Sequence, residues 1–170
     1  MTIALLIARL IVGLGLSAHG AQKLFGWFGG YGPKGTGDFF EGMGWRPGVL
    51  FAVAAGLGEV GGGLLVALGF MGGIGPGLIV LVMLTAIITS HLGKGFFVPN
   101  GWELPGLYIA GALAIDFAGF GVYSLDNAFG LNVLTTDSVR WVIIGAAIVL
   151  ALLSAGARLL PRPASATVTK

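Results

Sequence analysis

The chain has 170 residues, of which 56% are hydrophobic and 9% are charged. So few charged residues cannot cover a water-soluble domain of this length, and the composition therefore predicts a protein that crosses a membrane several times. The net charge is +2, and the sequence lacks the Lys and Arg cluster that would bind nucleic acid. The absence of cysteine excludes thiol chemistry and Cys-ligated metal centres in this chain.

Five apolar segments are long enough, at about 20 residues each, to cross a hydrocarbon core of ~30 Å. We expect helical spans at residues 3–21, 48–70, 74–92, 104–122 and 138–160. The fourth segment contains Asp116 and several glycines, and it is also compatible with a piece that enters and leaves the membrane on one side. Between the first two segments, GTGDFFEGMGW is expected to form a short interfacial or re-entrant piece.

The charges of the loops predict the orientation. Arg158, Arg162 and Lys170 follow the fifth segment's apolar core without any acidic residue, whereas residues 123–137 carry two aspartates and no Lys or Arg. Because Lys and Arg are enriched on the cytoplasmic side, we predict a cytoplasmic C-terminus and a location in the bacterial cytoplasmic membrane. The tail over residues 161–170 is rich in Pro, Ser and Thr and is predicted to be disordered.

Charged residues inside the predicted spans are costly in lipid and therefore mark positions of interest. Away from the ends of the predicted spans, these residues are Arg9, Glu59 and Asp116. Counting about 1.5 Å per residue from the expected inner helix ends puts all three in one layer. We therefore predict a buried ion pair between Arg9 and Glu59, with Asp116 as a second partner or a separate group nearer the outer face. Such a pair can fix helix register only, or it can form a proton-handling site.

A second polar layer is expected near the cytoplasmic face. His19 and His91 end the first and third spans, which run in the same direction, and the adjoining loops add further polar and aromatic residues: Gln22, Lys23, Lys94, Asn100, Trp102 and Glu103. Histidine and lysine donors against apolar helix walls can bind a quinone carbonyl or an anionic group. The histidines can instead cap backbone carbonyls or ligate a metal, although no close-spaced ligand motif supports a metal site. Haem is disfavoured because both histidines lie at helix ends beside lysines.

Five stretches follow one another in an order typical of one protein family. They are RLIVGLGLSAHGAQKLFGWFGGYG, DFFEGMGW, GLGEVGGGLLVALG, HLGKGFFVPNGWELPGLYIAGALAI and YSLD. Together they resemble the DoxX family of small bacterial membrane proteins. The resemblance implies an all-α membrane protein, with a compact four-helix transmembrane bundle over residues 1–127 and a loop and additional fifth transmembrane helix over 128–160. Carried over by position, the family's polar signature falls on Arg9, His19, Gly20, Lys23, Gly26, Glu59, His91, Asn100 and Glu103.

The resemblance also implies a function. Relatives include DoxD-type subunits of an archaeal thiosulfate:quinone oxidoreductase and DoxX proteins of mycobacterial membrane complexes that handle thiol oxidants. By this resemblance the chain would be a quinone-binding subunit in which His19 or His91 exchanges protons and Lys23 stabilises the reduced oxygen. The residues expected to hold the quinone are His19, Gln22, Lys23, His91, Asn100, Trp102 and Glu103. Because the sequence shows no electron carrier, a partner subunit, a soluble oxidoreductase or a bound substrate would supply electrons.

Besides the quinone-binding subunit, two interpretations without catalysis stay open. The chain can be a non-catalytic membrane module, either a carrier for small solutes or lipids or an anchor for a soluble enzyme, since its many small residues suit tight packing equally well. A channel is a third reading, which a single short bundle supports only as a homo-oligomer.

Overall fold

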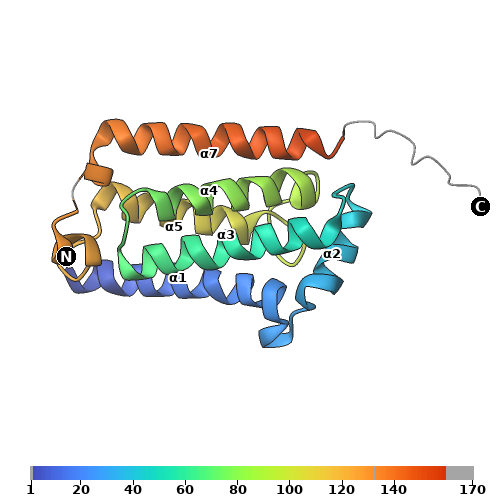
Figure 1. Ribbon diagram of the computed structural model, residues 1–170, viewed down its shortest axis with the longest axis horizontal. Coiled ribbons are helices and arrows are strands. Elements are labelled where there is room, and N and C mark those ends of the chain that lie inside the picture. The colour runs from blue at the N-terminus through green and yellow to red at the C-terminus, as the bar shows by residue number, and fades with distance from the viewer. Residues whose placement is uncertain (1, 132, 160–170) are drawn as a thin grey trace, which may run out of the picture.

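The computed structural model describes residues 2–131 and 133–159, and within these ranges the protein is helical without β-strands (Figure 1). The long helices are α1 (Thr2–Phe25), α3 (Gly48–Leu68), α4 (Ile74–Ala86), α5 (Glu103–Ala118) and α7 (Asp137–Ala157). Shorter elements join them: η1 (Trp27–Gly29), α2 (Gly32–Gly42), the π-helical turn η2 (Ile87–His91), α6 (Leu125–Phe129) and η3 (Val133–Thr135). The predicted disordered tail, 161–170, lies outside the described residues.

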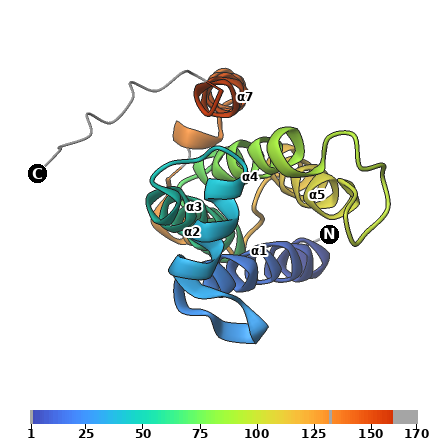
Figure 2. The same cartoon turned by 90° about the vertical axis from the view of Figure 1, so that its right-hand side faces the viewer.

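Four antiparallel helices form the bundle, and a fifth packs outside it. Figures 1 and 2 show α1, α3, α4 and α5 grouped together, with α7 lying against α4 on the outer side. The bundle core consists of Leu16, Val66, Ile79, Met83, Ala112, Ile115 and Phe120. The short helix α2 lies across the end of the bundle where α1 ends and α3 begins. The predicted all-α membrane bundle with an appended helix is confirmed.

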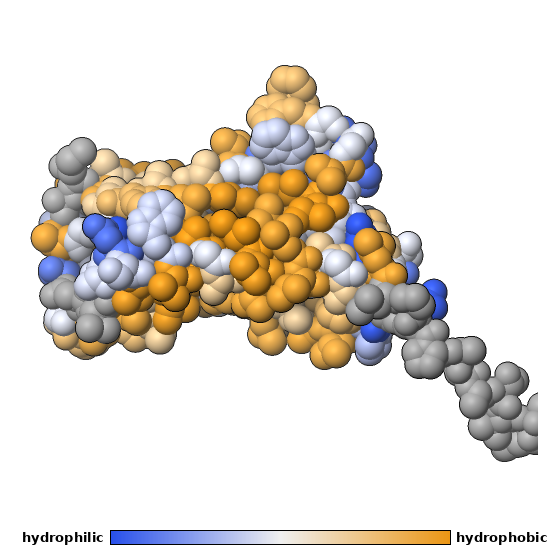
Figure 3. All heavy atoms as spheres, turned by 90° about the horizontal axis from the view of Figure 1, so that it is seen from above, coloured by the Kyte–Doolittle hydropathy of each residue, from blue (hydrophilic) through white to orange (hydrophobic). Residues whose placement is uncertain are grey.

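Four helical stretches are long and apolar enough to cross a membrane: Ile3–Phe25, Gly48–Leu68, Ile74–His91 and Asp137–Ala157. Large apolar side chains stay exposed along them, which indicates a lipid rather than an aqueous environment. Figure 3 shows an apolar band between more polar ends on the face that α7 covers. Helix α5 is shorter than the predicted span at 104–122, because it ends at Ala118, where Gly119 adopts a φ of 80°.

Glycines allow α1 and α3 to approach closely. A Cβ atom at Gly13 would lie 2.4 Å from the carbonyl oxygen of Gly63, and one at Gly20 would lie 2.7 Å from that of Gly56. These two contacts leave no room for a side chain, so the helices pack backbone to backbone as small-residue stripes do in membranes. The same contacts fix the antiparallel register of α1 against α3.

This register separates Arg9 from Glu59, and the predicted ion pair between them is therefore wrong. The hydroxyl of Ser17 donates to the carbonyl of Val60 (3.3 Å), so Ser17 lies level with Glu59. Arg9 precedes Ser17 by roughly two turns of α1, or about 12 Å. Glu59 instead pairs with Lys23, which follows Ser17 in the chain.

Arg9 has a structural role at the end of the bundle opposite α2. The residue is 2% exposed, and its guanidinium donates to three backbone carbonyls, those of Val66 (3.2 Å), Ala67 (2.8 Å) and Phe120 (2.6 Å). The first two are carbonyls of the last turn of α3, which a cation stabilises. Arg9 thus ties the end of α3 to the loop that follows α5.

Asp116 lies near that same end and is not part of the contacts of Arg9 or Glu59. Of the two alternatives for Asp116, a second partner or a separate group, the structure shows the separate group. Its carboxylate lies 3.2 Å from Nε of Arg140, and Arg140 also donates to the backbone carbonyl of Asp116 at 3.0 Å. Both side chains are buried. Since Arg140 belongs to α7, this pair attaches the appended helix to α5.

Candidate functional site

A small cavity of about 130 Å³ lies inside the bundle toward the end that carries α2. Its walls come from α1, α3, α4, η2 and α5: Leu16, His19, Lys23, Glu59, Met83, Ala86, His91, Leu104, Pro105 and Tyr108. We call this space the inner cavity. Half of its lining residues are apolar, and half carry groups that can donate or accept protons. Three residues predicted from the sequence, His19, Lys23 and His91, line it together.

An ion pair forms one wall of the inner cavity. Nζ of Lys23 lies 2.5 Å from Oε2 of Glu59, and the two side chains are 24% and 5% exposed. A carboxylate this deeply buried is costly unless a cation compensates it. Lys23 supplies the cation from the last turns of α1, and its long stem reaches back along the helix to Glu59.

His19 is held in a defined orientation by Gln22. The side-chain amide of Gln22 donates from Nε2 to the backbone carbonyl of Phe28 (3.1 Å), so its Oε1 atom faces Nδ1 of His19 at 3.2 Å. A carbonyl oxygen only accepts, and Nδ1 of His19 must therefore carry the proton. In the neutral ring Nε2 of His19 is then an acceptor.

The same reasoning applies to His91. This residue ends the π-helical turn η2, and its Nδ1 atom lies 2.8 Å from the backbone carbonyl of Asn100. Nδ1 again donates, so these two hydrogen bonds leave Nε2 of both histidines as the ring atoms for a ligand. The π-helical turn is typical of functional positions in helices.

Tyr108 is a member of the cavity that the sequence reasoning missed. Its ring lies edge-on to His19, with centroids 5.8 Å apart and an interplanar angle of 84°. A Cβ atom at Gly15 would lie 2.9 Å from the hydroxyl oxygen of Tyr108, so glycine at this position makes room for the phenol. One tyrosine in the otherwise apolar stretch LYIAGALAI was the signal that could have identified it.

The other predicted binding residues lie outside the inner cavity. Asn100 contributes its backbone carbonyl to His91, and Trp102 packs edge-on against Phe96 with centroids 4.7 Å apart. Glu103 accepts from the backbone N–H of Val98 at 3.1 Å and so closes the loop between η2 and α5. These residues shape the loop, which projects from the side of the bundle in Figure 2.

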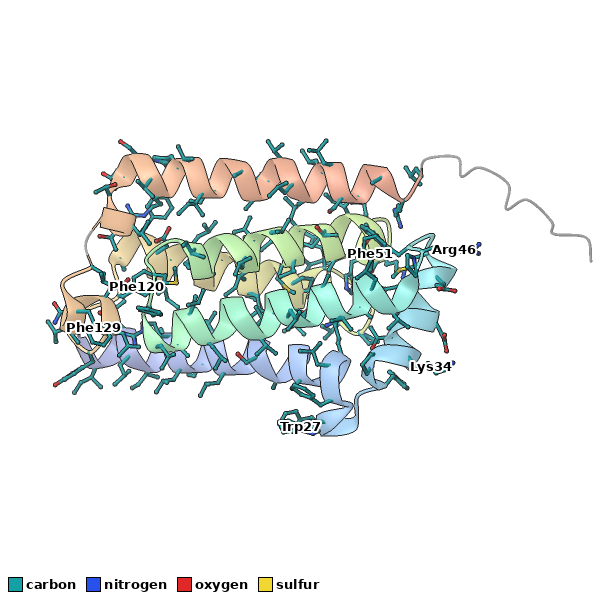
Figure 4. All side chains as sticks on the ribbon, in the orientation of Figure 1. Trp27, Lys34, Arg46, Phe51, Phe120 and Phe129 are labelled. Carbon is teal, nitrogen blue, oxygen red and sulfur yellow. The ribbon has the colours of Figure 1, made fainter. Side chains whose placement is uncertain are left out.

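A larger cavity of about 620 Å³ lies between the end of α1, the segment around η1, and α2. It is lined by Gln22, Lys23, Gly29, Gly30, Tyr31, Gly35, Thr36, Phe39 and Phe40. We call this space the interfacial groove. Figure 4 shows Trp27 and Lys34 at this end of the molecule and Phe129 at the opposite end. Lys23 lines both the groove and the inner cavity.

Metal ligands do not gather around either space. Within the part of the chain that the structure describes, no group of three or more His, Asp or Glu side chains is close enough to hold a metal ion. The inner cavity instead offers hydrogen-bond donors and acceptors: two imidazoles, a phenol and an ammonium–carboxylate pair. This set suits a small ring that carries hydrogen-bonding groups better than a cation.

The comparisons with known proteins give one match. The model of the DoxX family matches residues 4–92, which is more than half of the chain. The matched range runs from α1 to the turn after η2, and it includes His19, Lys23, Glu59 and His91 but not Tyr108. No curated protein and no solved structure matches the chain.

Proposed function

The chain belongs to the DoxX family, and we propose that it is an integral membrane subunit of an oxidoreductase system that binds the head of a quinone in the inner cavity. One observation carries the proposal: His19, His91, Tyr108 and the Lys23–Glu59 pair converge on one small, partly open cavity between the helices, whose other lining residues are apolar. A quinone head is a flat apolar ring with two carbonyl acceptors. Apolar walls with a few convergent donors are the surroundings that such a ring requires.

The residues of the cavity fit a quinone by their donor set. The ammonium of Lys23 and the hydroxyl of Tyr108 can donate to the carbonyls, and Leu16, Met83 and Leu104 supply apolar surface for the ring. A bound quinone would supply redox chemistry in which electrons and protons are taken up together. The chain contributes proton exchange at Nε2 of His19 or His91, because Nδ1 of each ring is held by an acceptor.

The source of electrons lies outside this chain in the proposal. The sequence contains no cysteine, and the described residues hold no cluster of metal ligands. Electrons would therefore come from a partner subunit, from a soluble oxidoreductase, or from a substrate bound beside the quinone. Exposed loops at the α2 end offer the surface nearest to the cavity for such a partner.

We also infer that the α2 end faces the cytoplasm. Lys23, Lys34, Arg46, Lys94 and Arg158 belong to this end. The opposite end exposes Asp137, and its two arginines, Arg9 and Arg140, are buried in hydrogen bonds. The excess of accessible Lys and Arg at the α2 end favours the cytoplasmic side of the bacterial inner membrane.

Binding of quinones without tails tests the proposal. Menadione and duroquinone carry a naphthoquinone and a benzoquinone head, and one of them should raise the thermal unfolding midpoint of the purified protein. At a concentration about 100-fold above Kd the rise should be roughly 5–10 °C. His19→Ala and His91→Ala should abolish the rise, while Phe129→Ala, at the far end of the bundle, should keep it.

Two results would contradict the proposal. One is the absence of stabilisation by either head in wild-type protein that is folded, and the other is equal stabilisation of the His19→Ala variant and the wild type. Capture of a soluble enzyme by protein that binds no quinone would then favour the anchor reading.

A further inference from the structure

The inner cavity is too small to hold a whole membrane quinone. Its volume of about 130 Å³ accommodates a small ring, whereas a quinone from a membrane also carries a long isoprenoid tail. The interfacial groove, at about 620 Å³, is several times larger. It shares one lining residue with the inner cavity, Lys23, so the two spaces both border this residue.

The groove has the lining of a site for an apolar chain. Tyr31, Phe39 and Phe40 supply aromatic surface, and a Cβ atom at Gly29 would meet nothing within 4 Å, so this glycine leaves bare backbone at which a chain can approach closely. Lys23 is the charged residue of its lining, and the ammonium of Lys23 is already held by Glu59.

Two further polar side chains of the groove, those of Gln22 and Thr36, are also engaged or buried. The amide of Gln22 is used by His19 and by the carbonyl of Phe28, and Thr36 is 8% exposed. An anionic head in the groove would therefore meet no cation that is free to pair with it among these lining residues. An apolar chain needs no cation to bind, and burying its surface against the aromatic lining is favourable.

The position of the groove fits a chain that enters from the bilayer. Trp27, Phe28, Tyr31 and Phe39 are 59%, 70%, 85% and 58% exposed around it. Exposed aromatic side chains at one end of a transmembrane bundle are typical of the level of the lipid headgroups. The groove thus lies where membrane lipid meets the end of α1.

We propose that the interfacial groove binds the isoprenoid tail of the same quinone whose head occupies the inner cavity, with Lys23 between head and tail. This inference rests on the proposed function, since it assigns the tail of the ligand that the inner cavity would hold. It adds a second binding site to the chain, formed by η1 and α2, and it predicts a preference for tailed over tail-less quinones.

Phylloquinone and menadione provide a matched pair of probes, because they share the naphthoquinone head and only phylloquinone has a tail. Binding of each to the protein in lipid nanodiscs is measured by quenching of tryptophan fluorescence. Phe39→Ala should weaken phylloquinone binding about tenfold, as expected from the loss of one aromatic contact, and leave menadione binding unchanged. Phe39→Leu, which keeps an apolar side chain in the groove, should restore most of the affinity.

Phe129→Ala is the control, because Phe129 is 66% exposed at the opposite end of the bundle and lines neither cavity. Comparing variants in identical nanodiscs cancels the partitioning of each quinone into lipid. Equal phylloquinone binding by Phe39→Ala and Phe129→Ala, with menadione still bound, would overturn the groove assignment alone. Selective loss of phylloquinone in Leu104→Ala instead would place the tail between α1 and α5 and would also overturn it. Absence of binding for both probes would refute the proposed function together with this inference.

Discussion

At the scale of single residues, the most consequential contact is the ion pair between Lys23 and Glu59. It lies in the wall of the inner cavity, and Glu59 is almost fully buried among small residues of α3. Such pairs contribute little net stability when intact, because desolvation offsets their attraction, yet removing one partner leaves a charge in an apolar bundle. The pair therefore constrains the site more than it stabilises the fold.

Lys23→Met tests this asymmetry. We expect the free energy of unfolding to fall by about 3 kcal/mol, because Glu59 then lacks its cation. Adding Glu59→Gln to Lys23→Met should recover part of the loss, since the buried charge is gone. Thermal unfolding of the four combinations in detergent gives the coupling between the two residues, and strictly additive losses would contradict the pairing.

Lys34→Met is the matched control for this experiment. Lys34 forms an ion pair with Asp38 at 2.9 Å, and this hydrogen bond raises the pKa of Lys34. Both side chains are nevertheless widely exposed on α2, where water screens the attraction. The unfolding midpoint should stay close to that of the wild type.

The sequence predicted which residues lie together near a helix end, but it did not predict how α1 and α3 are aligned along their length. His19, Lys23 and His91 could be grouped because they follow the ends of two parallel-running spans. The partner of Glu59 could not be predicted, because counting residues from the expected helix ends placed His19 level with the start of α3 near Gly48. In the structure Gly20 packs against Gly56 instead. The residues of α3 are therefore shifted along α1 by roughly two turns of helix from the predicted alignment.

At the scale of elements, the glycine contact between α1 and α3 determines the shape of the site. It sets the register that brings Lys23 to Glu59, and it places the end of α1 against α2. Hydropathy alone predicted α3, α4 with η2, and α7 to within a few residues, since each is an uninterrupted apolar run. It did not predict that α1 continues to Phe25, because Gln22 and Lys23 are polar residues inside the helix.

Two glycines on α3 allow a matched test of that contact. A Cβ atom at Gly63 would lie 2.4 Å from the carbonyl oxygen of Gly13, whereas one at Gly61 meets no atom within 4 Å. Gly63→Ala should therefore destabilise the protein by about 1–3 kcal/mol through overpacking. Gly61→Ala should be neutral or stabilising by up to ~1 kcal/mol through helix propensity. Similar unfolding midpoints for the two variants would argue against close packing of α1 on α3.

At the scale of the whole molecule, the two ends of the bundle differ in accessible charge and in the spaces that they enclose. The α2 end carries accessible Lys and Arg, the two cavities and the projecting loop after η2. The opposite end is closed by Arg9, which bonds to three carbonyls, and by Asp126, which accepts from the backbone N–H groups of Met71 and Gly72. One end is therefore organised for binding and the other for holding helices together.

The orientation of these ends is open to direct labelling, since the natural chain has no cysteine. Lys34→Cys and Asn127→Cys place single exposed thiols at the α2 end and at the opposite end. In intact cells a membrane-impermeant maleimide should label Asn127→Cys, and it should label Lys34→Cys only after permeabilisation. The reverse pattern would put the cavities on the outer side of the membrane.

Photoaffinity labelling with an azidoquinone tests the central claim most directly, because it reports where a quinone head lies on the protein. We predict that irradiation attaches the probe to residues of the inner cavity, foremost His19, His91 and Tyr108, and that excess menadione or duroquinone prevents it. Labelling confined to the lipid-facing surface of α7, or unaffected by the competitors, would contradict a quinone site in the bundle.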